Sequence, residues 1–198
     1  QILCAKNPEA FHLEKEEIKK YLSKLVYPLY FLDFEALLSA LPYFPGMKPQ
    51  QFVLYQASIH KLSSPNKKPE HKAYLHEEVT DPRLKILEFL KSNLGDKGSI
   101  ITYHQQFEEG QLLKLKQDFP AYSELIESWI SRCWDLEKIF SNFWFYDKRQ
   151  EGSSSIKKVL PVVVPKLSYE DLSIKDGNSS VAAYLELLSL SPESEEFK

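Results

Sequence analysis

Two acidic residues stand two positions apart in an apolar, aromatic segment. Asp33 and Glu35 lie within YFLDFE, residues 30–35. In a strand, positions i and i+2 point to the same face, so this spacing predicts two carboxylates side by side. Two like charges on one face of an apolar strand repel each other and lose hydration. A divalent cation, which takes oxygen ligands, is the simplest way to offset both costs. The alternative is an edge strand whose polar side faces solvent; the flanking apolar residues favour a central strand.

Two further acids follow at the beginnings of expected helices. Glu108 lies in YHQQFEE, where an apolar strand ends and a helix begins, and Asp176 precedes the small-residue segment GNSSVAAY. Taken singly, Glu108 is explained by its favourable interaction with the helix dipole, and Asp176 by capping a helix. The order of the three acidic segments along the chain is more specific than any one of them.

That order resembles the DEDD-type exonucleases, a superfamily with the RNase H-like fold. FLDFE stands at its first motif, YHQQFE at its second, and SIKKVLP followed by DGNSSVAAYLEL at its last. More narrowly, the chain resembles a bacterial family, domain of unknown function 2779, over about residues 28–190. The segments that carry this resemblance are YFLDFEALLSALPYFPG, FVLYQASIH, SIITYHQQFEEGQL, WDLEKIF and SSSIKKVLPVVVPKLSYEDLSIKDG.

The superfamily resemblance implies a 3'–5' exonuclease that hydrolyses phosphodiester bonds in single-stranded DNA or RNA by a two-metal mechanism. It assigns catalysis and the binding of two Mg²⁺ or Mn²⁺ ions to Asp33, Glu35, Glu108 and Asp176. The alternative expectation is a catalytically degenerate RNase H-like module that binds nucleic acid, or a scaffold domain of a larger bacterial protein.

The chain departs from the superfamily pattern at three points. Glu108 replaces an Asp, and His104 stands where Asn is usual. The general base should be a Tyr or His four or five residues before the last acid, but Leu172 and Asp171 stand there. Either Asp171, a metal-bound hydroxide or another group then serves as the base, or this member does not cleave.

Three side chains are candidates for substrate binding. His104 lies in the second motif, and Lys157 and Lys158 open the helix before the last acid, where they are expected to contact phosphate. For such short lysine pairs the ordinary explanation is a solvated surface.

The elements expected to position these residues alternate in a recognisable order. A helix is expected over 11–25, strands over 29–38, 52–62 and 71–76, a helix from 82 to 94, a strand over 99–103 and a helix through 115. Helices are then expected over 119–130, 134–145, 154–160 and 178–190. This order predicts an α/β, RNase H-like fold with a mixed five-stranded sheet flanked by helices. We expect an N-terminal helical extension (1–27), the RNase H-like domain (28–190) and a tail (191–198).

Composition limits the remaining function classes. The 198 residues are 43% hydrophobic, which argues against disorder, and 6 Gly without a glycine-rich motif argue against a phosphate-binding loop. A net charge of −3 excludes binding nucleic acid through bulk positive charge, although a local basic groove remains possible as an alternative.

The cysteine count bears on the compartment. Cys4 and Cys133 are too few for a disulfide framework, which fits the reducing cytoplasm. No apolar run approaches ~20 residues, so no membrane partner is expected. The chain does not begin with Met, and we expect it to work beside other domains of a longer protein.

Overall fold

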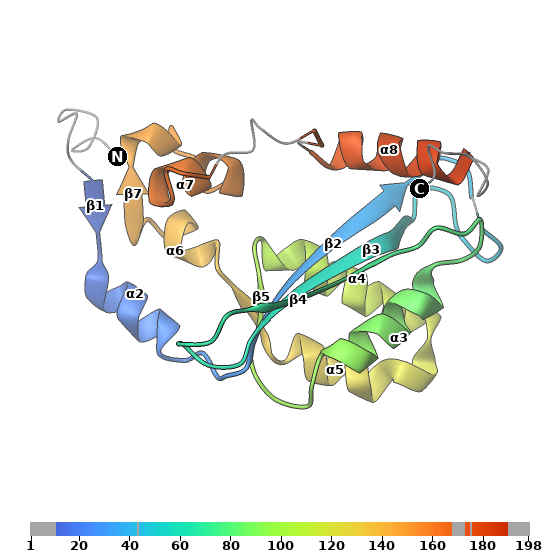
Figure 1. Ribbon diagram of the computed structural model, residues 1–198, viewed down its shortest axis with the longest axis horizontal. Coiled ribbons are helices and arrows are strands. Elements are labelled where there is room, and N and C mark those ends of the chain that lie inside the picture. Colours follow the sequence, from blue (N-terminus) through green and yellow to red (C-terminus); the bar gives the residue numbers. More distant parts are fainter. Residues whose placement is uncertain (1–10, 43, 168–172, 175, 190–198) are drawn as a thin grey trace.

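The fold is known from a computed structural model of the chain, which describes residues 11–42, 44–167, 173–174 and 176–189 (Figure 1). The strands are β1 (Phe11–Leu13), β2 (Leu29–Leu38), β3 (Phe52–Leu62), β4 (Glu70–Leu75), β5 (Ile100–Thr102), β6 (Cys133–Asp135) and β7 (Phe145–Asp147). The α-helices are α2 (Lys15–Leu22), α3 (Arg83–Asn93), α4 (Gln105–Asp118), α5 (Ser123–Ile130), α6 (Lys138–Ser141), α7 (Ile156–Val163) and α8 (Gly177–Ser189). Two 3₁₀ turns are η1 (Pro120–Tyr122) and η2 (Lys148–Gln150).

Five strands form one mixed sheet in the order β4-β3-β2-β5-β6. The first three in the chain, β2, β3 and β4, are an antiparallel meander. The next two, β5 and β6, run parallel to β2 on its other side. The expectation of an α/β protein with a mixed five-stranded sheet flanked by helices is confirmed, and β2 is its central strand.

The two faces of β2 have different environments. Tyr30, Leu32 and Phe34 are buried and pack with apolar side chains of α3, α4 and α5 in the main core. The alternate residues Phe31 and Asp33 are exposed on the opposite face, because successive side chains of a strand point to opposite sides. Figure 1 shows α8 along the sheet on the side away from α3, α4 and α5.

A register shift next to Glu35 shapes this second face. Glu35 pairs with Gln56, but the next residue of β2 pairs with Leu54, so Tyr55 is the extra residue of a β-bulge. Tyr55 is buried with Leu37 and Tyr184 of α8, and its ring stacks on that of Tyr184 at 3.9 Å. The bulge thus provides the aromatic surface on which α8 packs.

Two expected helices are corrected by the structure. The segment expected as one helix over 11–25 contains β1, which pairs with β7, and the shorter α2. The segment expected as a helix over 134–145 contains the end of β6, then α6 and the start of β7. These strands have three residues each, too few for an alternating pattern to show in the sequence, and each forms by pairing with a strand distant in the chain.

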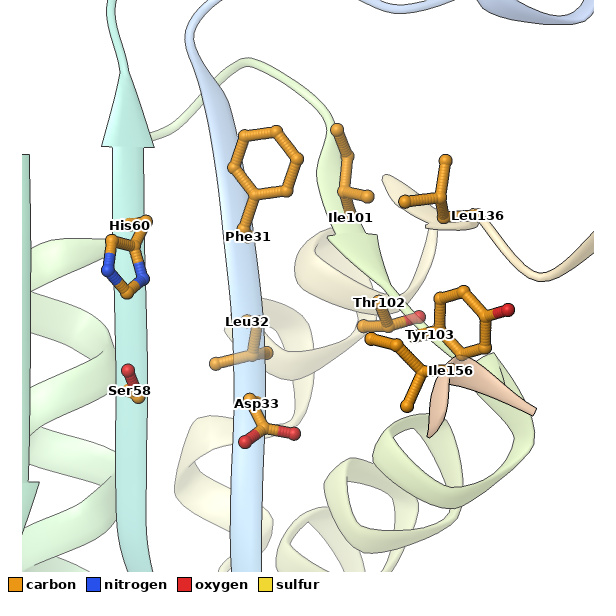
Figure 2. Close-up of a pocket in the computed structure, with 10 residues that line it drawn as sticks. All are labelled: Phe31, Leu32, Asp33, Ser58, His60, Ile101, Thr102, Tyr103, Leu136 and Ile156. Carbon is orange, nitrogen blue, oxygen red and sulfur yellow. The ribbon is translucent and has the colours of Figure 1, made fainter. Parts of the chain in front are cut away.

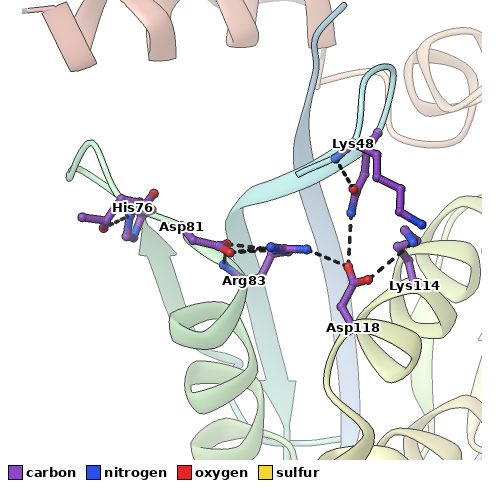
Figure 3. A network of polar contacts seen from close by, with 8 residues as sticks. Lys48, His76, Asp81, Arg83, Lys114 and Asp118 are labelled. Carbon is purple, nitrogen blue, oxygen red and sulfur yellow. Dashed lines mark hydrogen bonds and ion pairs between the residues drawn. The ribbon is translucent and has the colours of Figure 1, made fainter. Parts of the chain in front are cut away.

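A buried polar cluster ties the β2–β3 loop to the helices (Figure 3). Arg83, at the start of α3, is 9% exposed; its guanidinium donates to both carboxylate oxygens of Asp81 and, at 2.8 Å, to Asp118 at the end of α4. The same Asp118 carboxylate accepts a hydrogen bond from the Gln51 side chain, which in turn accepts one from the backbone N–H of Lys48. This Arg83 clamp holds the loop against the ends of α3 and α4.

Among the helices in these described ranges, none is long and apolar enough to cross a membrane.

Candidate acidic site

The two acids of β2 lie on the face away from the main core, as their spacing predicts. Asp33 pairs with Ser58 of β3, and Glu35 pairs with Gln56. Asp33 keeps contact with solvent, but neighbouring protein atoms remove part of its hydration, and this raises its pKa. Partial burial also raises the pKa of Glu35, the charge of Asp33 adds to it, and a hydrogen bond from Ser180 opposes it. Both carboxylates therefore lie where a positive charge would stabilise their ionised forms.

Glu108 is the most unusual carboxylate of the site. It lies in the first turn of α4, is 4% exposed, and its Oε2 has no hydrogen-bond partner among the described residues. Burial raises the pKa of Glu108 to about 7, and the charges of Asp33 and Asp135 contribute. A buried carboxylate oxygen without a hydrogen-bond donor requires an explanation, and a role in binding a ligand or a cation is one such explanation.

Topology brings Glu108 close to Asp33. β5 runs parallel to β2 beside it, with Ile101 level with Phe31, so the chain leaves β5 and enters α4 close to the level of Asp33. His104, between β5 and α4, has a left-handed backbone (φ 71°), which turns the chain abruptly from strand to helix.

The start of α8 lies beside Glu35. A Cβ atom added to Gly177 would lie 3.9 Å from Glu35 Oε2. Asp176, directly before it, is exposed, and its Oδ1 accepts hydrogen bonds from the Ser179 backbone N–H at 2.9 Å and hydroxyl at 3.1 Å. These bonds lower the pKa of Asp176. In the structure Asp176 caps a helix, as one interpretation of the sequence held, and it does so next to Glu35.

The acid pair separates two hollows on this face. The first, of 380 Å³, is lined by Asp33, Ser58, His60 and Tyr103, among others, and Figure 2 shows the Asp33 carboxylate between β3 and the residues after β5. The second, of 560 Å³, is lined by Glu35 and the start of α8. A ligand extended along β2 would pass both acids.

Two acidic residues near the site were not predicted as site residues. Asp135, 8% exposed at the end of β6, accepts the backbone N–H of His104 at 3.1 Å and that of Glu137. Glu137 pairs through Oε2 with His104 Nδ1 at 2.7 Å and accepts the Ser154 hydroxyl at 2.7 Å through Oε1. Both residues lie in the segment WDLE, residues 134–137, which the sequence pattern predicted as part of a helix rather than as the end of a strand.

The predicted substrate-binding residues differ in their surroundings. His104 keeps an exposed ring beside Glu137. The charge of Lys157 lowers the pKa of Asp176, which places the two near one another, whereas Lys158 forms an ion pair with Glu151. The candidate base, Asp171, lies outside the described residues.

The acids converge in part. Electrostatic coupling joins Asp33 to Glu35 and to Glu108, while Asp176 is held by its own helix. Within the described ranges, no three His, Cys, Asp or Glu side chains already form a group that could hold a metal ion. Carboxylate oxygens, which Asp33, Glu35 and Glu108 supply, are the ligands that Mg²⁺ and Mn²⁺ prefer, and such ions usually use one or two carboxylates together with water and phosphate.

The profile of a family described as Domain of unknown function (DUF2779) matches residues 30–155. The chain belongs to this family. The expected membership of this family is confirmed. The matched range includes Asp33, Glu35 and Glu108 of the first two acidic segments and ends before Asp176.

The chain is also similar to the "Uncharacterized protein MG366 homolog" of Mycoplasma pneumoniae (strain ATCC 29342 / M129 / Subtype 1), at 24% identity over 180 residues and 82% of this chain. It spans 27% of that relative's length. No solved structure matches the chain significantly.

Proposed function

We propose that this DUF2779 chain is an RNase H-like, metal-dependent nuclease that hydrolyses phosphodiester bonds at the ends of single-stranded nucleic acid, with the 3'–5' polarity that its resemblance implies. One observation carries the proposal: Asp33 and Glu35 share one face of the central strand, and the buried carboxylate of Glu108, one oxygen of which has no hydrogen-bond partner among the described residues, lies in electrostatic reach. The strand order supports the fold assignment, since an antiparallel meander followed by two parallel strands beside its first strand is the arrangement expected of that fold.

Divalent cations would be held by Asp33, Glu35 and Glu108, with Asp176 joining if it releases Ser179. When bound, such ions lower the pKa of a water molecule and stabilise the leaving oxygen. The energetic reason for binding is visible in the three acids of β2 and α4. Burial raises the pKa of each, and a cation offsets the cost of keeping them ionised.

Neighbouring residues of the chain position these ligands. Ser180 bonds Glu35, and its hydroxyl lies 2.7 Å from that of Tyr55, which connects the acid to the aromatic contact beneath α8. Asp135 accepts the N–H of His104 and thereby fixes the start of the helix that carries Glu108. Lys157, close to Asp176, is placed to contact a phosphate group.

The second candidate is a nucleic-acid-binding or scaffold module without catalysis. It is favoured by one observation: Asp176 already uses its carboxylate to cap α8. Calorimetric titration with Mn²⁺ separates the two candidates. The nuclease should bind Mn²⁺ in a manner that Glu35→Gln weakens at least about tenfold, whereas a module without catalysis should bind weakly and show no such dependence.

The direct test is incubation with end-labelled DNA and RNA oligonucleotides in Mg²⁺ or Mn²⁺, followed by gel analysis. Wild-type protein should shorten the oligonucleotides, and Asp33→Asn should lower the rate by at least about a hundredfold. Glu109→Gln is the matched control, because Glu109 follows Glu108 in α4 but is not one of the proposed ligands. Its carboxylate accepts a hydrogen bond from the Gln105 side chain. Absence of cleavage by wild type, or equal cleavage by Asp33→Asn, contradicts the proposal.

A further inference from the structure

The hollow that contains Glu35 does not end at the acids. Phe52, the first residue of β3, lines both this hollow and an adjoining one of 400 Å³. Phe52 pairs with Leu38, three residues and about 10 Å along β2 from Glu35, so its side chain lies on the opposite face of the sheet, where it contacts Phe107 of α4. The hollow reaches from one face to the other around the side of β2, which β5 pairs only at Tyr30 and Phe31. The two hollows therefore adjoin, and a chain leaving the acids in this direction meets Phe52 next.

Phe52 presents an aromatic ring at this point. It is 41% exposed, and its ring packs edge-on against Phe107 of α4, with centroids 5.8 Å apart and planes at 89°. A buried core ring would be covered, whereas this one is held in place by its neighbour and is still open to solvent. Exposed, immobilised rings are the surfaces on which unpaired bases stack.

Beyond Phe52 the adjoining hollow is lined by two lysines. Lys48, on the β2–β3 loop, is exposed, and no ion pair is found for it with any described residue. Lys114 of α4 lies 3.5 Å from Asp118, but that carboxylate also serves the Arg83 clamp (Figure 3). Arg83 and Lys114 thus face the two carboxylates of Asp81 and Asp118, and the charge of Lys48 is left without an opposite charge among the described residues.

We propose that this groove binds single-stranded nucleic acid next to the end that is cleaved, with a base on Phe52 and phosphates at Lys48 and Lys114; the inference rests on the proposed function. An aromatic face followed by two lysines, of which Lys48 has no ion pair among the described residues, suits a strand in which bases and phosphates alternate. The location also resolves a conflict of charge. The acids of the site repel phosphate, and in a chain with a net charge of −3 a local basic segment supplies the attraction that overall charge does not.

The groove is formed before any ligand binds. The Arg83 clamp holds Gln51 and, through it, the backbone of Lys48, while the helix that carries Lys114 also carries Phe107 and Glu108. Little backbone ordering is then required on binding, which favours affinity.

The experiment measures binding of fluorescein-labelled oligothymidine and oligouridine by anisotropy in EDTA, where no cleavage occurs. Lys48→Gln/Lys114→Gln should weaken binding at least about tenfold and lower the slope of log K against log salt by about 1.4, since each phosphate contact to a single strand contributes ~0.7. Phe52→Leu, which stays apolar but loses the ring, should weaken binding about tenfold with the slope unchanged.

The matched control is Lys67→Gln/Lys68→Gln, which removes the same charge from the turn at the other end of β3. It should bind like wild type. Absence of wild-type binding, or equal losses in the groove and control variants, overturns the inference. If circular dichroism shows that the double variant is unfolded, the exposed single substitution Lys48→Gln decides, with an expected slope change of about 0.7.

Hydrolysis of bis(p-nitrophenyl) phosphate, which is too small to reach Phe52, separates this inference from the proposed function. The lysine variants should hydrolyse it at the wild-type rate while cleaving oligonucleotides more slowly. Groove-dependent binding without any cleavage would leave the binding groove standing and remove the nuclease. If the protein cleaves but wild type and groove variants bind the oligonucleotides equally, the binding groove is refuted and the nuclease stands.

Discussion

Replacing Glu108 by Gln should make the metal-free protein more stable at neutral and alkaline pH. Burial raises the pKa of Glu108 from 4.5 to about 7. The folded state therefore holds a proton that the unfolded state has released, and stability falls as pH rises from 4.5 through 7. At ~1.36 kcal/mol per pKa unit, the full penalty above pH 7 is about 3 kcal/mol, and at pH 5 it is below about 1 kcal/mol. A neutral amide of similar shape removes this pH-dependent penalty.

The measurement is thermal and urea unfolding in EDTA at pH 5 and pH 8. At pH 8 the variant should melt about 6–12 °C above wild type, since ~2–4 °C corresponds to 1 kcal/mol in a domain of this size, and at pH 5 the two should nearly coincide. Glu109→Gln is the control, expected to change stability by less than about 0.5 kcal/mol at either pH.

Mn²⁺ should remove most of this difference at pH 8. At a hundredfold excess over its dissociation constant, a bound ion stabilises the wild type by about 3 kcal/mol, and the variant should gain much less. A Glu108→Gln protein that is no more stable than wild type at pH 8 would refute the reasoning, because the buried carboxylate would then carry no penalty for a cation to offset.

Three other substitutions test the scaffold by urea unfolding. Arg83→Leu leaves the partly buried Asp81 without its cation and Asp118 with Lys114 alone, and should cost about 2 kcal/mol, a loss that raising the salt concentration reduces only slightly; no loss would make the Arg83 clamp dispensable. Tyr184→Ala removes the ring stacked on Tyr55 and should cost about 3 kcal/mol while weakening Mn²⁺ binding, since α8 also borders Glu35; unchanged stability would contradict the packing of α8. Gly98→Ala should cost at least about 2 kcal/mol, because the residue has φ +99° and a Cβ would collide with the carbonyl oxygen of Pro28; a neutral result would refute that close approach.

Sequence periodicity predicted the long elements of the sheet well. Strands expected over 29–38 and 52–62 have those bounds, and the strand expected over 71–76 is β4, displaced by one residue. Such segments are long enough for the alternation of buried and exposed side chains to be visible. The three-residue strands β1, β6 and β7 are defined by their partners across space, and a local pattern carries no information about those partners.

The same limit explains the site. The shared face of Asp33 and Glu35 follows from a spacing of two in a long strand, so the sequence was sufficient to predict it. Asp135 and Glu137 were missed because their role depends on β6 pairing with β5, a contact between segments more than thirty residues apart. The burial of Glu108 was equally invisible, because an acid in the first turn of a helix is explained by the helix dipole alone.

Several unfavourable features of the fold lie near Asp33. His104 adopts a left-handed backbone, one carboxylate oxygen of Glu108 is buried without a partner among the described residues, and the pKa values of Asp33 and Glu35 are raised on the neighbouring strand. Each costs stability, and a left-handed residue other than glycine alone costs of order 1 kcal/mol. Elsewhere the same chain satisfies a buried charge fully, as it does in the Arg83 clamp. A sequence able to build that clamp could have used an apolar residue in place of Glu108, and accepting these costs beside Asp33 is the pattern expected where function rather than folding has selected the residues.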